Sequence, residues 1–404
     1  MIMREGTGVR RRLRIGIDGG CWLNRRGYGR YTRSLLAALA KRDDGDQYIL
    51  FIDRETAAAP DLPPRFEQVI VPTSQPPAQA ASASGRRSVR DLFRMGWAVA
   101  RYPLDAFFFP SVYTFFPLLR PVRTVVAIHD VIAERHPHMV FARRRFAWFW
   151  RIKVSLAVRQ ARLLLTVSEY AHDSIVAHFR LPTERVRVVL EAPDPMFRPL
   201  DAPRAPTELL PSCALPPESR YVLYVGGLSP HKNLPVLIEA YRRLHGEREF
   251  SDLRLLLVGD YSGDVFLSAY DELRATVERG GLVGRVHFTG FVPDEALVDL
   301  YNRAELLVLP SIEEGFGLPA LEAVACGTPV VVSETGPISA LLGPAAWAFP
   351  SHDTGALTEG LRMLLHDPAR RHAMRTEGLR RAANFTWDRA AAQVHALFHE
   401  LTGG

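Results

Sequence analysis

The chain has 404 residues, of which 47% are hydrophobic, 10% aromatic and 23% charged. This composition is that of a globular protein and excludes a disordered, collagenous or fibrous one. Because a single hydrophobic core rarely serves more than roughly 250 residues, we expect two domains. The formal net charge of +6 would suit anionic phosphates, an acidic membrane surface or nucleic acid, and it does not choose among them.

The three cysteines, Cys21, Cys213 and Cys326, are widely separated and lack metal-ligand spacing. We therefore expect neither a disulfide framework nor a zinc site, and a reducing compartment. The basic N-terminus lacks the apolar stretch of roughly 7 to 15 residues that a secretory signal contains. No stretch reaches the roughly 20 apolar residues of a membrane-spanning helix. A cytoplasmic protein is expected, either soluble or peripheral at the inner face of the membrane.

Short apolar runs alternate with amphipathic segments in the first half of the chain. Strands are predicted at 13–18, 48–53, 105–110, 124–130, 163–169 and 185–190, and helices at 31–42 and 145–160. Such alternation is typical of a parallel sheet covered by helices on both faces. The stretch 72–88, rich in Pro, Ala, Ser and Gln, is predicted to be a flexible surface loop.

Eight prolines between about 191 and 219 interrupt this pattern and predict a linker. The alternation then restarts, with strands predicted at 220–227, 253–260, 285–291, 304–311 and 328–334. The chain should therefore contain two doubly wound, Rossmann-like α/β domains with a cleft between them. Ligands of such sheets bind outside the carboxyl ends of the strands, so the segments that follow strands are the candidate sites.

The segment SIEEGFGLPALEAVACGTPVVVSE follows a predicted strand and carries Glu314 and Glu322, eight positions apart. Pro319 suits the first turn of a helix, so a loop with Glu314 should lead into a helix that carries Glu322 near its start. Free N–H groups of this loop and the helix dipole would favour a phosphate or sugar hydroxyls. The alternative is a strand–loop–helix turn whose glycines and acids serve only local geometry.

The string EGFGLPALEAVACGTPVV resembles the E-x7-E signature of retaining glycosyltransferases with the two-Rossmann GT-B fold, namely glycosyltransferase family 4, or group 1. The resemblance implies an N-terminal acceptor domain over 1–200, a C-terminal nucleotide-sugar donor domain over 201–385, and a closing helix over 386–404 that returns to the first domain. In this family the first glutamate contacts the donor sugar and the second binds the ribose. Donor binding is thereby assigned to Glu314, Glu322, Gly315, Phe316, Gly317 and Leu318.

Lys232 follows a predicted strand and a glycine turn in YVGGLSPHKNLPVLIEAY. An ammonium group at the head of a helix could neutralise a diphosphate, although a single lysine there is often only solvated. The segment is similar to the family's VGR-x4-K element, with Gly227 at the position of the arginine. The resemblance implies a donor-binding role for this segment, and Arg30 or Lys153 could supply the missing charge.

Gly27 and Gly29 follow the first strand in a segment that resembles the family's first glycine loop, which lines the donor phosphate and the acceptor. The third glycine and the acid of a dinucleotide fingerprint are missing, which disfavours an oxidoreductase. His129 ends a predicted strand in AIHDVIAERHP. A histidine there is often structural, and the resemblance places it near the 6-hydroxyl of the donor sugar. Ser168 and Glu169, at another strand end, are given a supporting role.

The segment 143–160 interleaves four aromatic residues with Arg143, Arg144, Arg145, Arg151 and Lys153. Basic and aromatic residues mixed on one helix suit an anionic bilayer surface. The alternative is a helix that packs its aromatic side against the sheet and exposes a basic side. A membrane contact would favour a lipid-linked acceptor.

These features predict a retaining, metal-independent hexosyltransferase. It would move a hexose, with mannose from GDP-mannose favoured by the resemblance, to a hydroxyl of a saccharide or lipid-linked acceptor. His129 and Glu314 would position the sugar, and Lys232 would stabilise the departing diphosphate. No cofactor, metal or nucleic-acid partner is expected, because no D-x-D motif follows a predicted strand. The alternatives are a non-catalytic sugar or lipid-carrier binding module and a nucleotide-dependent oxidoreductase.

Overall fold

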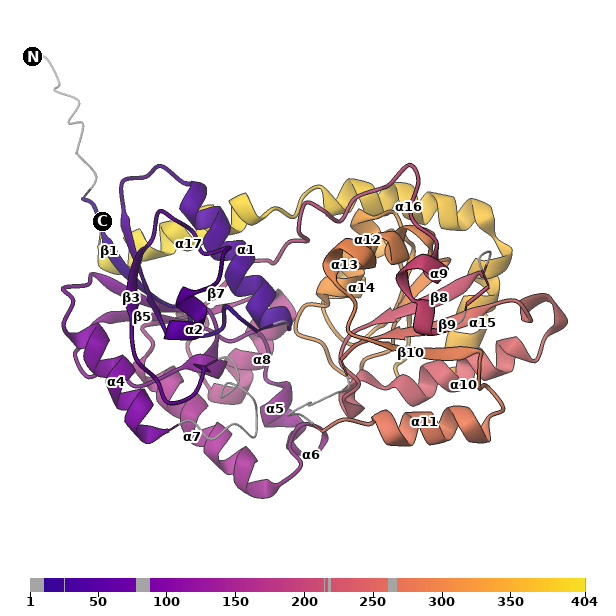
Figure 1. The fold of residues 1–404 in the computed structure, drawn as a ribbon, viewed down its shortest axis with the longest axis horizontal. Helices are drawn as coiled ribbons and strands as arrows, with labels where there is room; N and C mark the ends of the chain where they lie inside the picture. Colours follow the sequence, from indigo (N-terminus) through magenta and orange to yellow (C-terminus); the bar gives the residue numbers. More distant parts are fainter. Residues whose placement is uncertain are drawn as a thin grey trace, which may run out of the picture.

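The computed structural model describes residues 11–24, 26–77, 88–213, 215–216, 219–260 and 267–403. Each of its two lobes contains one parallel sheet (Figure 1). The predicted α/β class with two Rossmann-like domains is therefore confirmed. Of the loop predicted at 72–88, the part from 78 to 87 lies outside the described residues.

The sheet of the N-terminal lobe has seven parallel strands in the order β3-β2-β1-β4-β5-β6-β7. The strands are β1 (Arg14–Asp18), β2 (Gln47–Ile52), β3 (Glu67–Ile70), β4 (Ala106–Phe109), β5 (Arg123–Ala127), β6 (Leu163–Thr166) and β7 (Val186–Val188). Strands β4 and β6 are buried at every position, which explains their uninterrupted apolar sequences. The strand order reverses between β1 and β4, and such a switch point is where doubly wound sheets bind ligands.

Helices cover both faces of this sheet. On one face, α1 (Gly27–Lys41) and α17 (Trp387–Thr402) pack in the same hydrophobic cluster as Phe108 of β4. On the other face, α4 (Val89–Ala100) and α7 (Arg144–Gln160) pack with Phe107 and Phe109. The other α-helices in the described part of this lobe are α2 (Arg54–Ala57), α5 (Ile132–Arg135), α6 (Pro137–Val140) and α8 (Glu169–Phe179).

The C-terminal lobe repeats this plan with six parallel strands in the order β10-β9-β8-β11-β12-β13. The strands are β8 (Tyr221–Val225), β9 (Arg254–Val258), β10 (Val286–Gly290), β11 (Leu306–Leu309), β12 (Val330–Ser333) and β13 (Ala346–Phe349). The helices are α10 (Leu234–His245), α11 (Tyr270–Arg279), α12 (Asp294–Arg303), α13 (Leu318–Ala325), α14 (Ile338–Leu342), α15 (Thr354–His366) and α16 (Pro368–Ala382). The switch point of this sheet lies between β8 and β11.

The proline-rich segment between β7 and β8 contains the short helix α9 (Pro206–Leu209). Its Arg204 forms an ion pair of 2.6 Å with Asp299 of α12, and the Leu200 N–H donates to Asn302 Oδ1 at 2.8 Å. The segment thus follows the surface of the C-terminal lobe before it enters β8.

The last helix, α17, crosses from the C-terminal lobe to α1 (Figure 1). His395 and His399, one turn apart, both direct Nε2 at Asp46 Oδ2, at 3.0 and 2.8 Å. The other oxygen of Asp46 accepts the Leu13 N–H. These side chains form a group that could hold a metal ion. However, Nδ1 of His395 faces the guanidinium of Arg42, which can only donate a hydrogen bond. Nδ1 therefore accepts, and Nε2 carries the proton that is donated to Asp46. We interpret the group as a hydrogen-bonded latch between α17 and the segment before β2.

Replacing Asp46 with asparagine should destabilise the chain by about 1–3 kcal/mol, because the buried His399 loses its charged acceptor and His395 is left with Asp44, at 3.1 Å, alone. Urea unfolding followed by circular dichroism measures this loss. Asp43→Asn is the matched control, since the Asp43 side chain is 93% exposed and a surface substitution should leave the unfolding midpoint unchanged. Equal midpoints for the two variants would show that the latch contributes nothing to stability.

Candidate active site

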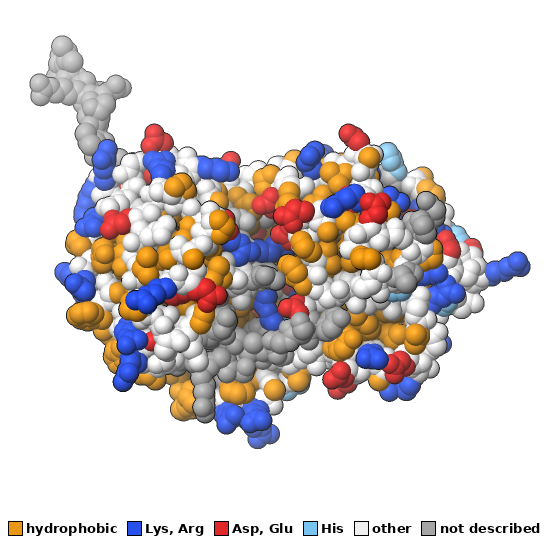
Figure 2. Space-filling model, in the orientation of Figure 1, with side chains coloured by type: hydrophobic (Ala, Val, Ile, Leu, Met, Phe, Trp, Pro, Cys, Tyr) orange, Lys and Arg blue, Asp and Glu red, His pale blue; other side chains and the backbone are white. Residues whose placement is uncertain are grey.

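The surface is hollowed between the two lobes, and Figure 2 shows Lys and Arg side chains in this hollow with acidic side chains beside it. Segments that follow strands of both sheets meet here. The Ser168 hydroxyl, after β6, donates to the carbonyl oxygen of Gly315, after β11, at 2.6 Å. The backbone of Gly315 also lies against the His129 carbonyl after β5. The carboxyl edges of the two sheets therefore face each other, as binding between the lobes requires.

Lys232 and Glu314 form an ion pair at the switch point of the C-terminal sheet. The Lys232 ammonium donates to both oxygens of Glu314, at 3.0 and 2.8 Å, and the Ser311 hydroxyl donates to Oε2 at 3.0 Å. Burial alone would raise the pKa of Glu314, but the charge and hydrogen bonds of Lys232, aided by Ser311, lower it below its usual value. The pair thus places one cation and one ionised carboxylate together in the cleft.

Lys232 is held in place by the turn that it ends. It closes a short 3-10 turn after β8, and the next residue, Asn233, has a left-handed backbone with φ 56°. Asparagine tolerates this conformation better than most residues. Its side-chain amide donates to the carbonyls of Pro310 and Ser351, at 3.1 and 2.6 Å. The turn that presents Lys232 is thereby fixed to the chain that leaves β11.

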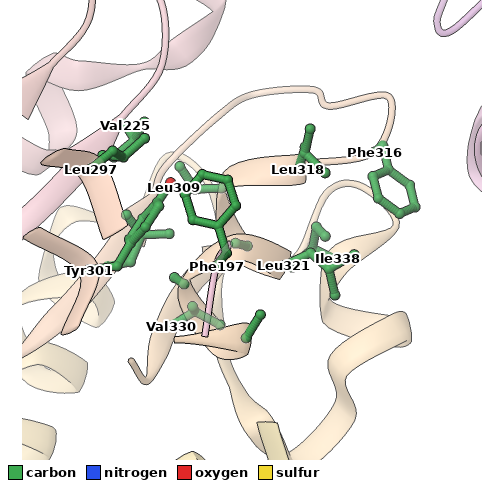
Figure 3. Packing of buried hydrophobic residues seen from close by; sticks show 14 of the residues in the cluster. Phe197, Val225, Leu297, Tyr301, Leu309, Phe316, Leu318, Leu321, Val330 and Ile338 are labelled. Carbon is green, nitrogen blue, oxygen red and sulfur yellow. The ribbon is translucent and has the colours of Figure 1, made fainter. Parts of the chain in front are cut away.

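The loop after Glu314 leads directly into α13, as predicted. Gly317, with φ 88°, precedes the first helical residue, Leu318, and Pro319 occupies the first turn. A Cβ on Gly315 would lie 2.7 Å from the His129 carbonyl oxygen, so only glycine allows this approach between the lobes. Behind the loop, buried hydrophobic side chains anchor it, among them Phe316, Leu318, Leu321 and Ile338 (Figure 3).

Glu322 is fully buried at the junction of the lobes. Its carboxylate pairs with Arg30 of α1 at 2.6 Å and accepts the Tyr301 hydroxyl at 3.0 Å. Burial raises its pKa to about 7, although Arg30 opposes the shift. Arg30 also approaches Asp294 at 3.4 Å and lies over the ring of Phe197. Phe197 in turn packs edge-on against Tyr301 (Figure 3). Arg30 therefore covers the carboxylate that was predicted to meet a ribose.

His129 and the neighbouring Asp130 project from the end of β5. Burial lowers the pKa of His129 to about 4, so its ring is neutral at neutral pH. One ring nitrogen bonds the Pro110 carbonyl, and Nε2 has no partner among the described residues. Burial raises the pKa of Asp130 to about 6, and Glu314 adds to this shift. The ring of His129 is thus neutral, and its unpartnered Nε2 is sealed from solvent at this edge of the cleft.

The glycines of the predicted first loop instead belong to a helix. Gly27 and Gly29 lie in the first turn of α1, which begins four residues before the predicted start. A Cβ on Gly29 would come within 1.9 Å of the Asn24 carbonyl oxygen, whereas one on Gly27 would meet open space. The chain folds back across the head of α1, and Gly29 is needed for this contact.

The remaining predicted residues serve the cleft less directly. Gly227 follows β8, and a Cβ there would make only an ordinary contact with Ser229 Oγ, at 3.9 Å. Lys153 is turned to the Tyr113 carbonyl, at 3.2 Å, and to the Trp150 ring. Ser168 caps α8 as well as bonding Gly315, and Glu169 lies in the first turn of that helix. Arg30 is engaged with Glu322, and Lys153 with Tyr113 and Trp150.

Sequence reasoning missed a second ion pair between the lobes. Glu313, only 3% exposed, accepts from Arg135 at 2.7 Å and lies 2.9 Å from Nε2 of His136. These residues are 178 and 177 positions apart. No motif links them, although both basic residues lie in the sequence ERHP, which begins four positions after Asp130. The pair fixes the neighbour of Glu314 to the N-terminal lobe.

Two Rossmann-like lobes with facing carboxyl edges define the GT-B fold, and an ionised Lys–Glu pair lies between them. The sequence model described as Glycosyl transferases group 1 matches residues 207–381, and that of Glycosyltransferase Family 4 matches residues 25–194. The chain belongs to this family, glycosyltransferase family 4 or group 1, and is a glycosyltransferase that uses a nucleotide sugar.

Individual relatives agree with this assignment. The chain is 31% identical over 307 residues to O-antigen chain mannosyltransferase B of Escherichia coli, across 74% of this chain and 76% of the relative. It is 33% identical over 279 residues to D-inositol 3-phosphate glycosyltransferase of Rhodococcus opacus, across 68% of this chain and 60% of the relative.

Solved structures share the fold at low identity. Sucrose-phosphate synthase of Thermosynechococcus elongatus superimposes with a TM-score of 0.74 at 21% identity, across 97% of this chain and all of that one. HepE of Anabaena, in complex with UDP-glucose, gives a TM-score of 0.72 at 18% identity, across 96% and 100%. These likenesses confirm the GT-B arrangement of the lobes.

Proposed function

We propose that this enzyme transfers mannose from GDP-mannose, with retention of configuration, to a hydroxyl of a saccharide or lipid-linked acceptor. The observation that carries the proposal is the Lys232–Glu314 pair at the switch point of one sheet, opposite His129 at the carboxyl edge of the other. A diphosphate and a sugar between the lobes would meet a cation, an ionised carboxylate and a neutral imidazole.

Each of these groups has a defined part in the proposal. Lys232, together with the N–H groups before α13, stabilises the negative charge that grows on the departing diphosphate. Glu314 and His129 orient the sugar hydroxyls. Closed lobes exclude water and hold the acceptor oxygen near the anomeric carbon. In this proposal the acceptor oxygen attacks the anomeric carbon on the face from which the diphosphate leaves, and a leaving phosphate oxygen takes its proton.

The choice of mannose rests on similarity to a protein named as a mannosyltransferase. Other donors are tested as well, because a structure with the same fold is a complex with UDP-glucose. Purified protein is incubated with GDP-mannose, UDP-glucose and dTDP-glucose, each with and without EDTA, and release of the nucleoside diphosphate is measured. Turnover of GDP-mannose that survives EDTA supports the proposal. Turnover of only another donor, or loss of turnover in EDTA, would overturn the choice of donor or the metal independence.

We also propose that the N-terminal lobe rests on an anionic membrane through α4 and α7. In α7 the ring of Trp150 is buried and Phe146 packs partly against the same core, while Trp148 and Phe149 are 59% and 61% exposed. Phe93 and Trp97 of α4 are 58% and 60% exposed. Both helices cover the same face of the sheet. Exposed arginines flank these rings, including Arg90, Arg94, Arg144, Arg145 and Arg151.

Such a surface joins apolar rings with positive charge, the combination that binds acidic bilayers from one side. Among the described residues, every helix is too short or too polar to cross a bilayer. A lipid-linked acceptor would bring its sugar to the cleft of a lobe held in this way.

The double variant Trp148→Ser, Phe149→Ser should lose most of its binding to vesicles of phosphatidylcholine and phosphatidylglycerol, because buried apolar area and charge act together there. Co-sedimentation measures the bound fraction. Val283→Ser is the control, since Val283 is 72% exposed on the other lobe. The membrane contact would be contradicted if the bound fraction of wild-type protein did not rise with the phosphatidylglycerol content of the vesicles. It would also be contradicted if the double variant bound as well as wild type.

A further inference from the structure

A groove lies at the amino ends of the strands of the N-terminal sheet. These ends face away from the cleft, toward the outer end of the lobe where the C-terminus also lies (Figure 1). Two adjoining hollows of about 410 and 1010 Å³ share the segments 104–105 and 118–122 as walls. Their other lining residues come from the starts of β1 and β5 and the ends of α4 and α7. The two hollows together are called the arginine groove below.

The lining of the arginine groove is strongly basic. Among the described residues it contains one carboxylate, that of Asp105, and six arginines, namely Arg11, Arg12, Arg14, Arg120, Arg123 and Arg162. A hollow lined by charges of one sign concentrates ions of the opposite sign. The groove therefore favours an anionic ligand.

The single carboxylate does not neutralise this charge, because it is already engaged. Asp105 Oδ1 pairs with Arg11 at 2.5 Å, and Oδ2 accepts the Arg14 N–H at 2.9 Å. The side chains of Arg14 and Arg123 donate to neutral oxygens, those of a glutamine amide and a backbone carbonyl. Most of the guanidinium charge in the groove thus remains uncompensated.

Three of the arginines are available to a ligand. The side chains of Arg12, Arg120 and Arg162 are exposed and have no hydrogen bond or ion pair with any described residue. A guanidinium group binds a phosphate through two parallel hydrogen bonds, and it stays charged at every physiological pH. Several such groups around one hollow suit a ligand that carries more than one phosphate charge.

The backbone that carries two of these arginines is held in place. In the loop of Arg120, the Leu118 N–H donates to Gln160 Oε1 at the end of α7, at 3.0 Å. Arg162 follows α7, and its own N–H donates to the Thr124 carbonyl of β5 at 2.8 Å. Because the chain is already ordered at both positions, a ligand would have to order only the side chains.

The arginine groove adjoins the exposed rings of α4. Val99 and Ala100, near the end of that helix, line the groove. Arg101 lies over the ring of Trp97 at 5.0 Å. Leu119, which lines both hollows, is 47% exposed. A phosphate group can therefore reach the groove from solution or from the surface of a membrane that meets α4.

We propose that the arginine groove binds a ligand with more than one phosphate charge, at a second site that is separate from the cleft. The ligand is a soluble phosphate compound or the headgroup region of acidic lipids, which present the same chemistry to the arginines. The site does not depend on which nucleotide sugar the enzyme uses.

Sodium pyrophosphate is the probe for this chemistry, and its binding to the whole chain is measured by titration calorimetry. The double variant Arg120→Gln, Arg162→Gln should bind it about 10-fold or more weakly than wild type, because two groups that form charge-assisted hydrogen bonds are lost. Pyrophosphate could also enter the cleft, so both proteins are measured again with Lys232→Ala added. The loss caused by the two arginine substitutions should be the same there, since distant sites act independently.

The matched control is the double variant Arg54→Gln, Arg180→Gln. It removes two exposed arginines of the same lobe that lie outside the groove, and it changes the net charge equally. It should bind pyrophosphate as wild type does. The inference would be overturned if the two double variants had equal affinity, or if Lys232→Ala alone abolished the binding of pyrophosphate.

Co-sedimentation with vesicles of phosphatidylcholine and phosphatidylglycerol then identifies the source of the phosphate. If the groove binds lipid headgroups, pyrophosphate should release wild-type protein from the vesicles, and the groove variant should bind them less than the control variant. If neither change occurs while the affinity for pyrophosphate still depends on Arg120 and Arg162, the ligand is a soluble phosphate compound.

Discussion

Lys232→Ala is expected to lower kcat/KM for the nucleotide-sugar donor by roughly 100- to 1000-fold, the loss that follows removal of one group that stabilises developing charge. The Lys232 ammonium is the cation closest to Glu314, at 2.8 Å, and it closes the turn that faces the opposite lobe. Release of nucleoside diphosphate under initial-rate conditions measures the effect.

Two further variants separate catalysis from folding. Lys232→Ala leaves Glu314 partly buried and without its cation, so a double variant that adds Glu314→Gln removes the unpaired charge. The double variant should regain thermal stability and stay as inactive as the single one. Lys41→Ala, on the exposed last turn of α1, should keep wild-type rates. If the Lys232 variant turned over donor within about threefold of wild type, the diphosphate would have to bind elsewhere.

Gly315→Ala should lower kcat/KM by roughly 100-fold while the protein stays folded. Its new methyl group would stand 2.7 Å from the His129 carbonyl oxygen and 2.9 Å from Asp130 Cβ, which forces the two carboxyl edges apart. A displacement of about 1 Å between reacting groups is enough for such a loss. Rate assays and a circular dichroism spectrum are recorded on the same preparation.

The control for this prediction is Gly246→Ala. Gly246 is exposed after α10, and its nearest contact for an added Cβ is 3.4 Å, so rate and fold should both remain unchanged. Normal turnover by Gly315→Ala would mean that the lobes do not approach at Gly315 in the working enzyme.

Most strands could be predicted because parallel sheets covered on both faces require long apolar runs. The exceptions are two edge strands, one in each sheet. β3 (Glu67–Ile70) has the half-polar sequence EQVI and shows no such run, whereas β13 (Ala346–Phe349) has the short apolar sequence AWAF, which was not predicted as a strand. The start of α1 was also misjudged, because glycines were interpreted as a loop although Gly29 serves a close contact inside a helical turn.

The site was predictable where local sequence determines geometry. The glycine loop, Pro319 and the head of α13 follow from turn and helix-start preferences, and they bring Glu314 to the cleft. Pairs across the lobes have no such signal. Arg30 with Glu322 and Arg135 with Glu313 join segments that are remote in sequence, and only the closed arrangement of the lobes brings them together.

The central claim is that the Lys232–Glu314 pair binds a nucleoside diphosphate sugar between the lobes. Its most direct measurement is calorimetric titration of GDP-mannose into wild-type protein and Lys232→Ala. We expect one site per wild-type chain, competed by GDP, and an affinity reduced by about 10-fold or more in the variant. Equal affinity in both proteins, or no binding of GDP-mannose, UDP-glucose or dTDP-glucose by the wild type, would contradict the account.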